Sequence, residues 1–268
     1  MLATTKGGDQ NNVYQLGGHT DSVGAGPGIN DDGSGIIALL EIALKLTKYR
    51  VNNAIRFSFW AAEEEGLLGS SYYAETASNE TIAKIKLFND IDMIASPNFV
   101  YGVYDGDGST FNMTGPVGSG YLEKVYIDWF TKHGLPTVPV EFDGRSDYEG
   151  FILRGVPAGG LFTGAEGIKT AEEAKLFGGQ AGVAYDINYH GAGDTVSNNN
   201  GTAWLINSKA IAHTVALFGT SWKGFPTRPT LQERDVQYER TVRENAGIKT
   251  RANRGVSKKT PSWIERGI

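Results

Sequence analysis

The feature that most constrains the fold is a strand, helix, strand unit in the first quarter of the chain. Residues 13–18 (VYQLGG) and 54–62 (AIRFSFWAA) are apolar runs typical of short strands. Between these two runs, apolar residues recur at helical spacing: Ile36, Leu39, Leu40, Ala43 and Leu46. Two strands joined through a helix are expected to lie parallel in one sheet.

The alternation of strands and helices continues along the chain. We expect further strands at residues 86–94, 99–104 and 156–162, and helices at residues 120–132 and 204–217. This order predicts a three-layer α/β/α fold, with a mixed, largely parallel sheet that helices cover on both faces. In such folds ligands bind beyond the carboxyl ends of the strands.

Charge is spread unevenly over the 268 residues. Residues 223–268 hold 11 Lys and Arg against 5 Asp and Glu, a net charge of +6, whereas residues 1–222 carry −11. An acidic body argues against nucleic acid as a partner, because phosphate contacts need a basic face. We expect residues 1–222 to form the folded domain and residues 223–268 to be a basic, disordered tail, since apolar periodicity ends at Trp222.

Several sequence features bear on the compartment in which the protein is found. It has no run of 18 apolar residues, so no membrane span is expected, and its first residues lack the apolar core of a secretory signal. The absence of cysteine excludes a disulfide framework and a thiolate nucleophile. Sequons at Asn79, Asn112 and Asn200 are compatible with a glycosylated secretory protein, although a chain this rich in Asn, Ser and Thr also produces such triplets by chance.

Histidine and carboxylate residues follow the predicted strands. They lie in the segments GHTDS (18–22), GINDDGSG (28–35), AEEEG (62–66), DMI (92–94) and YHGAGD (189–194). Imidazole and carboxylate are the zinc ligands of hydrolases, and a pair of metal ions needs one shared carboxylate plus about two further ligands each. Each segment alone is a weak signal, but their joint occurrence at strand ends indicates a metal centre.

These segments resemble those of the co-catalytic dizinc aminopeptidases, especially the fungal secreted leucine aminopeptidases. The similarity runs from about Lys6 to Trp222 and includes GPGINDDGSG, AEEEGLLGS, DMIASPN, FDGRSDYEGF and NYHGAGDT. It implies the zinc exopeptidase fold and two Zn²⁺ ions per chain. The metal ligands that it implies are His19 and Asp92 for one ion, Glu64 and His190 for the other, and Asp31 as the bridge.

The resemblance also implies the chemistry. Glu63 matches the general base, and Tyr189 matches a donor to the tetrahedral oxyanion. Asp21 matches a carboxylate that does not bind the metal but orients the His19 imidazole. The Asp31-Asp32 peptide bond matches a position where the family has a cis bond. The activity implied is metal-assisted hydrolysis of the first peptide bond.

The family's substrate pocket matches four residues, which are Met93, Gly144, Arg145 and Phe162. Met and Phe there suit an apolar first residue such as leucine, on a peptide with a free N-terminus. The resemblance further implies a secreted or vacuolar protein, and we expect a monomer.

Other functions remain open at this point. A carboxypeptidase of the same superfamily would use the same five ligands, but it needs several basic residues for the substrate carboxylate, and only Arg145 is well placed. A glutaminyl cyclase lacks the first His ligand, against which His19 argues. The chain could also be an inactive fragment or a binding protein of this fold. The relatives carry a substantial segment before the first matching residue, so we expect an exposed apolar patch and a sheet edge here.

Overall fold

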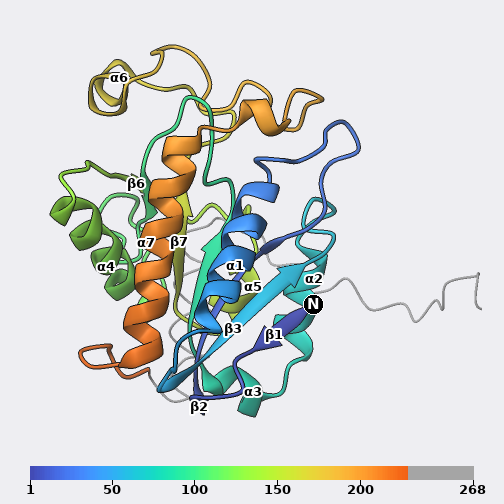
Figure 1. The fold of residues 1–268 in the computed structure, drawn as a ribbon, viewed down its shortest axis with the longest axis vertical. Coiled ribbons are helices and arrows are strands. Elements are labelled where there is room, and N and C mark those ends of the chain that lie inside the picture. The colour runs from blue at the N-terminus through green and yellow to red at the C-terminus, as the bar shows by residue number, and fades with distance from the viewer. Residues whose placement is uncertain (229–268) are drawn as a thin grey trace, which may run out of the picture.

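The computed structural model describes residues 1–228, which form a seven-stranded mixed sheet in the order β1-β3-β2-β4-β7-β5-β6 (Figure 1). The strands are β1 (Leu2–Thr4), β2 (Asp9–His19), β3 (Asn53–Trp60), β4 (Ile85–Ile91), β5 (Gly102–Tyr104), β6 (Val138–Val140) and β7 (Ala158–Phe162). Strands β3, β2, β4 and β7 run parallel, while β1 and β5 pair antiparallel with β3 and β7. The predicted mixed, largely parallel sheet is therefore confirmed.

Helices cover both faces of this sheet. They are α1 (Gly33–Leu46), α2 (Leu68–Thr76), α3 (Asn79–Lys84), α4 (Ser119–Lys132), α5 (Tyr148–Leu153), α6 (Ala171–Phe177) and α7 (Gly201–Thr220), with a 3-10 turn at Val196–Asn198. Residues of α1, α4 and α7 share one apolar core with the sheet, and residues of α3 and α5 share the other. The predicted three-layer architecture is confirmed, and Figure 1 shows α1 and α7 on the near face.

Alternating side chains of β4 pack into the two cores, because successive residues of a strand point to opposite faces. Leu87 and Ile91 pack on the side of α1 and α7, whereas Phe88 packs on the other side. There the Phe88 ring stacks on Phe151 of α5, with centroids 3.9 Å apart. The central strands are thus fixed from both faces, and so are the turns at their ends.

The strands stop earlier than the sequence predicted. The strand expected over 54–62 ends at Trp60, and the strand expected over 86–94 ends at Ile91. Glu63 and Asp92 consequently lie in the turns that follow. There the conformation of the turn sets the direction of each side chain, whereas within a strand the side chains alternate between the two faces. His19 is the last residue of β2, at the same edge of the sheet.

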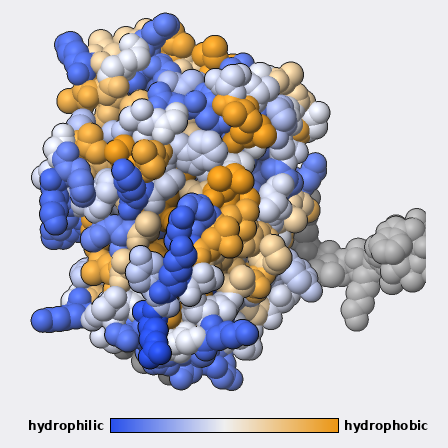
Figure 2. All heavy atoms as spheres, in the orientation of Figure 1, coloured by the Kyte–Doolittle hydropathy of each residue, from blue (hydrophilic) through white to orange (hydrophobic). Residues whose placement is uncertain are grey.

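An apolar surface is exposed along α1 and α7, as expected. Ile37, Leu44 and Leu205 are 52, 65 and 55% exposed, and a groove of about 670 Å³ runs between the two helices. Figure 2 shows apolar side chains gathered on this face. The short strand β1, whose residues are all exposed, forms the expected edge. In the described part of the chain, no helix is both long and apolar enough to cross a membrane.

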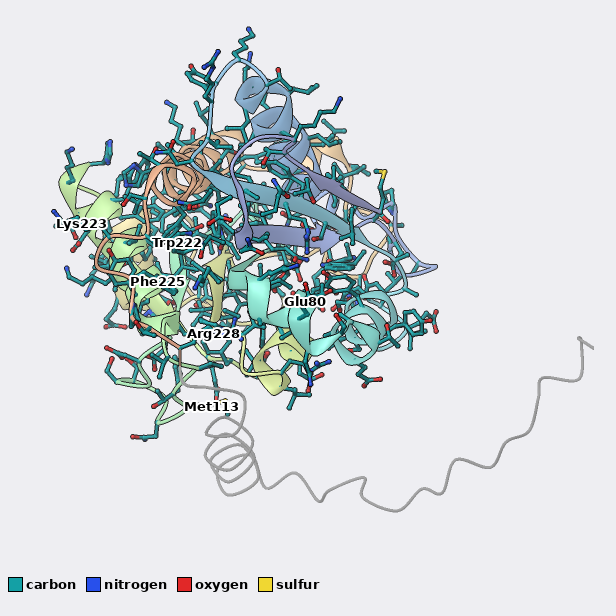
Figure 3. All side chains as sticks on the ribbon, turned by 90° about the horizontal axis from the view of Figure 1, so that it is seen from below. Glu80, Met113, Trp222, Lys223, Phe225 and Arg228 are labelled. Atoms are coloured by element: carbon teal, nitrogen blue, oxygen red, sulfur yellow. The ribbon has the colours of Figure 1, made fainter. Side chains whose placement is uncertain are left out.

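The folded domain extends past Trp222, where the sequence analysis placed its end. Phe225 packs its ring against Trp222 and Tyr121, with centroids 4.9 and 5.4 Å apart, and Arg228 donates a hydrogen bond to the Ile85 carbonyl. Figure 3 shows Trp222, Phe225 and Arg228 from below. Residues 223–228 therefore belong with the domain, and the rest of the predicted tail, residues 229–268, lies outside the described residues.

This boundary predicts that a chain ending at Trp222 is less stable than one ending at Arg228. Loss of the partly buried Phe225 ring should lower the free energy of unfolding by roughly 1–3 kcal/mol, below the cost of deleting a fully buried Phe. Urea unfolding of the two chains measures the difference, and Phe225→Ala in the longer chain should reproduce most of it. Equal stability of the two chains would place the boundary at Trp222 after all.

Candidate metal centre

The five predicted metal ligands converge at the carboxyl edge of the parallel strands. His19 closes β2, while Glu64 and Asp92 lie in the turns after β3 and β4. Asp31 precedes α1, and His190 lies in the long connection between β7 and α7. Because these parallel strands end at one edge of the sheet, residues up to 171 positions apart in sequence become neighbours.

Asp31 lies between two groups of ligands. Its Oδ1 is 3.1 Å from His19 Nε2, and its Oδ2 is 3.1 Å from His190 Nε2. On the first side, Asp92 Oδ1 is 3.7 Å from the same His19 nitrogen, and on the second side, Glu64 Oε2 is 3.0 Å from His190 Nε2. The pairing that the resemblance implied, with Asp31 in the middle, therefore matches the arrangement of the side chains.

Three of these ligands present buried atoms that lack a hydrogen-bond partner among the described residues: His19 Nε2, Asp92 Oδ1 and Glu64 Oε1. An unsatisfied buried polar atom is costly unless something else binds it. The other nitrogen of His19, Nδ1, faces the Asp21 carbonyl at 3.1 Å. If Nδ1 carries the proton, Nε2 keeps a lone pair for a metal, and the mixed nitrogen and oxygen donor set fits zinc.

The two histidines beside these carboxylates do not offset the cost of their burial. Burial, and then the neighbouring Asp31 carboxylate, raises the pKa of Glu64 to about 7. Burial is likewise the main cause that raises the pKa of Asp31. A divalent cation would remove both penalties at once, because it stabilises the charged form of every carboxylate around it.

Two carboxylates that the sequence analysis did not single out hold Asp31 in place. Asp32 accepts hydrogen bonds from the backbone N–H groups of His19, Gly35 and Met93, and so ties α1 to the ends of two strands. Asp194 accepts from the N–H groups of Asn30 and Asp31. The position of Asp32 just before a helix is an N-cap signal that could have identified it. The Asp31-Asp32 bond is cis, as predicted.

The contact of Asp21 differs from the predicted one. Its carboxylate oxygen is 3.9 Å from His19 Nδ1, too far for a hydrogen bond, and the backbone carbonyl makes the contact instead. The carboxylate accepts from the N–H groups of Glu63 and Glu64 at 3.1 and 3.2 Å. Asp21 thus links the His19 turn to the glutamate turn. Ser146, which the sequence analysis also missed, donates to Asp92 Oδ2 at 2.8 Å.

Glu63 lies beside the centre and faces a cavity of about 230 Å³, into which Asp31, Glu64, Asp92 and His190 also open. Burial, and then the Asp92 carboxylate, raises the pKa of Glu63 to about 9. Glu63 and Glu64 are adjacent in sequence yet differ in their neighbours, since only Glu64 contacts His190. The turn after β3 therefore places the two side chains beside different neighbours.

Three of the four predicted pocket residues line the same cavity: Met93, Arg145 and Phe162. Gly144 is not among the lining residues but precedes Arg145, with a positive φ of 79° and its N–H donating to the Tyr148 hydroxyl. Tyr189 also lines the cavity, and its ring stacks on His190 with centroids 3.8 Å apart. The cavity therefore combines an apolar wall with the carboxylates of the centre.

Comparisons with known proteins give the family of this chain. The model of peptidase family M28 matches residues 1–215. Leucine aminopeptidase 2 of Arthroderma otae is 57% identical over 236 residues, which are 88% of this chain and 48% of the relative. A probable leucine aminopeptidase 2 of Aspergillus fumigatus is 60% identical over 228 residues, 85% of this chain and 46% of the relative. The chain thus spans about half the length of these curated relatives.

Solved structures share the fold. A zinc aminopeptidase from Bacillus subtilis superposes with a TM-score of 0.65 at 22% identity, over 81% of this chain and 49% of that chain. An Acidobacteriales glutaminyl cyclase gives a TM-score of 0.60 at 19% identity, over 81% of this chain and 72% of that chain. Since the family model covers most of the chain and the fold agrees, the chain belongs to peptidase family M28.

Proposed function

We propose that this chain is the catalytic part of a zinc aminopeptidase that holds two Zn²⁺ ions and hydrolyses the N-terminal peptide bond of its substrate. The observation that carries the proposal is the position of Asp31 between two imidazole and carboxylate groups, beside a cavity that Glu63 faces. The names of the fungal relatives support the activity.

The proposed roles follow from the contacts. His19 and Asp92 would hold one ion, Glu64 and His190 the other, and Asp31 would bridge the two. Bound zinc would lower the pKa of a water molecule and polarise the substrate carbonyl. Glu63 would take the proton of that water and return it to the leaving amine, because a bound cation would favour the charged form of this carboxyl and so leave it able to accept a proton. The Tyr189 hydroxyl would donate to the oxyanion.

The cavity favours peptide substrates whose first residue is apolar, such as leucine. Met93 and Phe162 supply apolar surface beside the centre, and the carboxylates around it would attract the free amine of a peptide. We propose peptides with a free N-terminus as the partners, a monomer as the working unit, and a secreted protein as the native form.

The roles of two adjacent glutamates give the first prediction. Glu63→Gln should keep the zinc content and the fold, because the amide is nearly isosteric, while kcat for a leucine anilide falls by roughly 10²- to 10⁴-fold, as expected when a positioned proton carrier is lost. Glu64→Gln should instead lose one zinc ion per chain. Metal analysis and steady-state kinetics measure both.

The exposed neighbour Glu65 is the matched control, since Glu65→Gln changes the same charge one residue away and should alter neither property. If Glu63→Gln shed zinc and Glu64→Gln kept both ions, the two roles would have to be exchanged. Near-normal turnover of Glu63→Gln would end the general-base assignment.

A second prediction concerns the stability of the metal-free chain. The pKa values of Glu63 and Glu64 rise from 4.5 to about 9 and about 7, so between pH 4.5 and 9 the folded chain binds more protons than the unfolded chain. The free energy of unfolding should therefore fall as the pH rises through this window. Urea unfolding in a chelator at pH 5, 7 and 9 tests this.

Excess zinc should reverse the trend, because zinc replaces the protons as the pH rises and binds only the folded chain. Glu63→Gln should flatten the slope of the metal-free chain, since it removes one titrating group. A metal-free chain that is more stable at pH 9 than at pH 5 would contradict the picture of uncompensated carboxylates.

A further inference from the structure

Arg145 joins two other side chains at the mouth of the cavity. Its Nη1 donates to Glu166 Oε1 at 2.8 Å, and its Nη2 donates to the Tyr189 hydroxyl at 3.1 Å. Arg145 precedes α5, Glu166 follows β7, and Tyr189 adjoins the His190 ligand. One guanidinium thus connects three separate segments around the proposed site.

The bond from Arg145 decides where the Tyr189 hydroxyl can donate. A phenol has one hydrogen and can also accept, whereas a guanidinium can only donate. The Tyr189 oxygen therefore accepts from Arg145 through one lone pair, and its own hydrogen remains available to donate to another group. The ring itself is fixed by stacking on His190, at an interplanar angle of 26°. With the ring plane and one lone pair both fixed, few directions remain for the hydrogen, and the cavity that Tyr189 lines is open to it.

We propose that Glu166 is a positioning residue, which holds Arg145 so that the Tyr189 hydroxyl donates into the cavity. The Arg145 side chain is 53% exposed, and a long exposed side chain samples many rotamers unless a partner restricts it. Its other acidic neighbour, Asp143, is 4.0 Å from Nη1, beyond hydrogen-bond distance. Without Glu166 the guanidinium could turn toward Asp143 and leave Tyr189.

The pair is not needed to stabilise the fold. Both partners are more than half exposed, and an exposed ion pair contributes little to the free energy of unfolding. The guanidinium instead donates from two nitrogens to two different partners, which fixes their relative geometry and for which lysine is a poor substitute. The effect of Glu166 should therefore appear in turnover and not in stability.

This inference rests on the proposed function, in which Tyr189 assists hydrolysis. Glu166→Gln should lower kcat about tenfold, a part of the roughly 10²- to 10³-fold loss when an oxyanion donor is removed outright. KM, zinc content and melting temperature should stay near their original values. Glu172→Gln on α6 is the matched control, because it removes the same charge from an exposed residue outside the cavity and should leave kcat unchanged.

A double-mutant cycle separates positioning from a general structural effect. In a Tyr189→Phe background, which lacks the hydroxyl, Glu166→Gln should have no further effect on kcat. Arg145→Lys should behave like Glu166→Gln, because the positive charge remains but the planar group that donates to two partners is lost. Additive losses, a change confined to KM, or an unchanged kcat of Glu166→Gln would each overturn the proposal.

The mobility of Arg145 provides a test that needs no turnover. The NMR order parameter of the Arg145 Nε–H bond should fall in Glu166→Gln and stay unchanged in Glu172→Gln. If the order parameter does not fall, the positioning role of Glu166 is wrong even in an active enzyme. If wild-type chain neither binds zinc nor cleaves a leucine anilide, the proposed function fails, and the order parameter still decides whether Glu166 holds Arg145.

Discussion

The burial of several carboxylates in one cavity is the constraint on which the rest of this structure depends. Asp31, Glu63, Glu64 and Asp92 open into one cavity, with His19 and His190 as the nearest basic groups. Burial raises the pKa of Glu63 from 4.5 to about 9. A protein gathers such groups only when a cation or a proton compensates them, which is why this arrangement is typical of functional sites.

The fold keeps these groups together in two ways. Central parallel strands that pack on both faces hold the strand ends at one edge, and carboxylates outside the ligand set fasten the turns to each other. Asp32 links His19 to Met93, Asp21 links His19 to the glutamate turn, and Asp194 holds the backbone of Asp31. Backbone N–H groups thus supply to these three carboxylates what the ligands would obtain from a metal. The backbone N–H groups donate to Asp32, Asp21 and Asp194, so the ligand atoms without a hydrogen-bond partner stay available to a metal.

The sequence predicted the central strands, α1, α4 and α7, because these elements are long enough to show an apolar period. It did not reveal β1, β6, α2, α3, α5 or α6, which have three to nine residues, too few for a clear apolar period to appear. The resemblance to the dizinc aminopeptidases implied the five ligands, and the structure brings all five side chains together. The contacts of Asp21 and Arg145 could not be foreseen, since they depend on how turns far apart in sequence face one another.

We propose that Asp31 bridges two zinc ions, and diffraction from zinc-soaked crystals on either side of the zinc absorption edge tests this most directly. Two anomalous peaks per chain are expected, one beside His19 and Asp92 and the other beside Glu64 and His190. A different oxygen of Asp31 should bind each ion. A single peak, or two peaks that leave Asp31 without a metal, would contradict it.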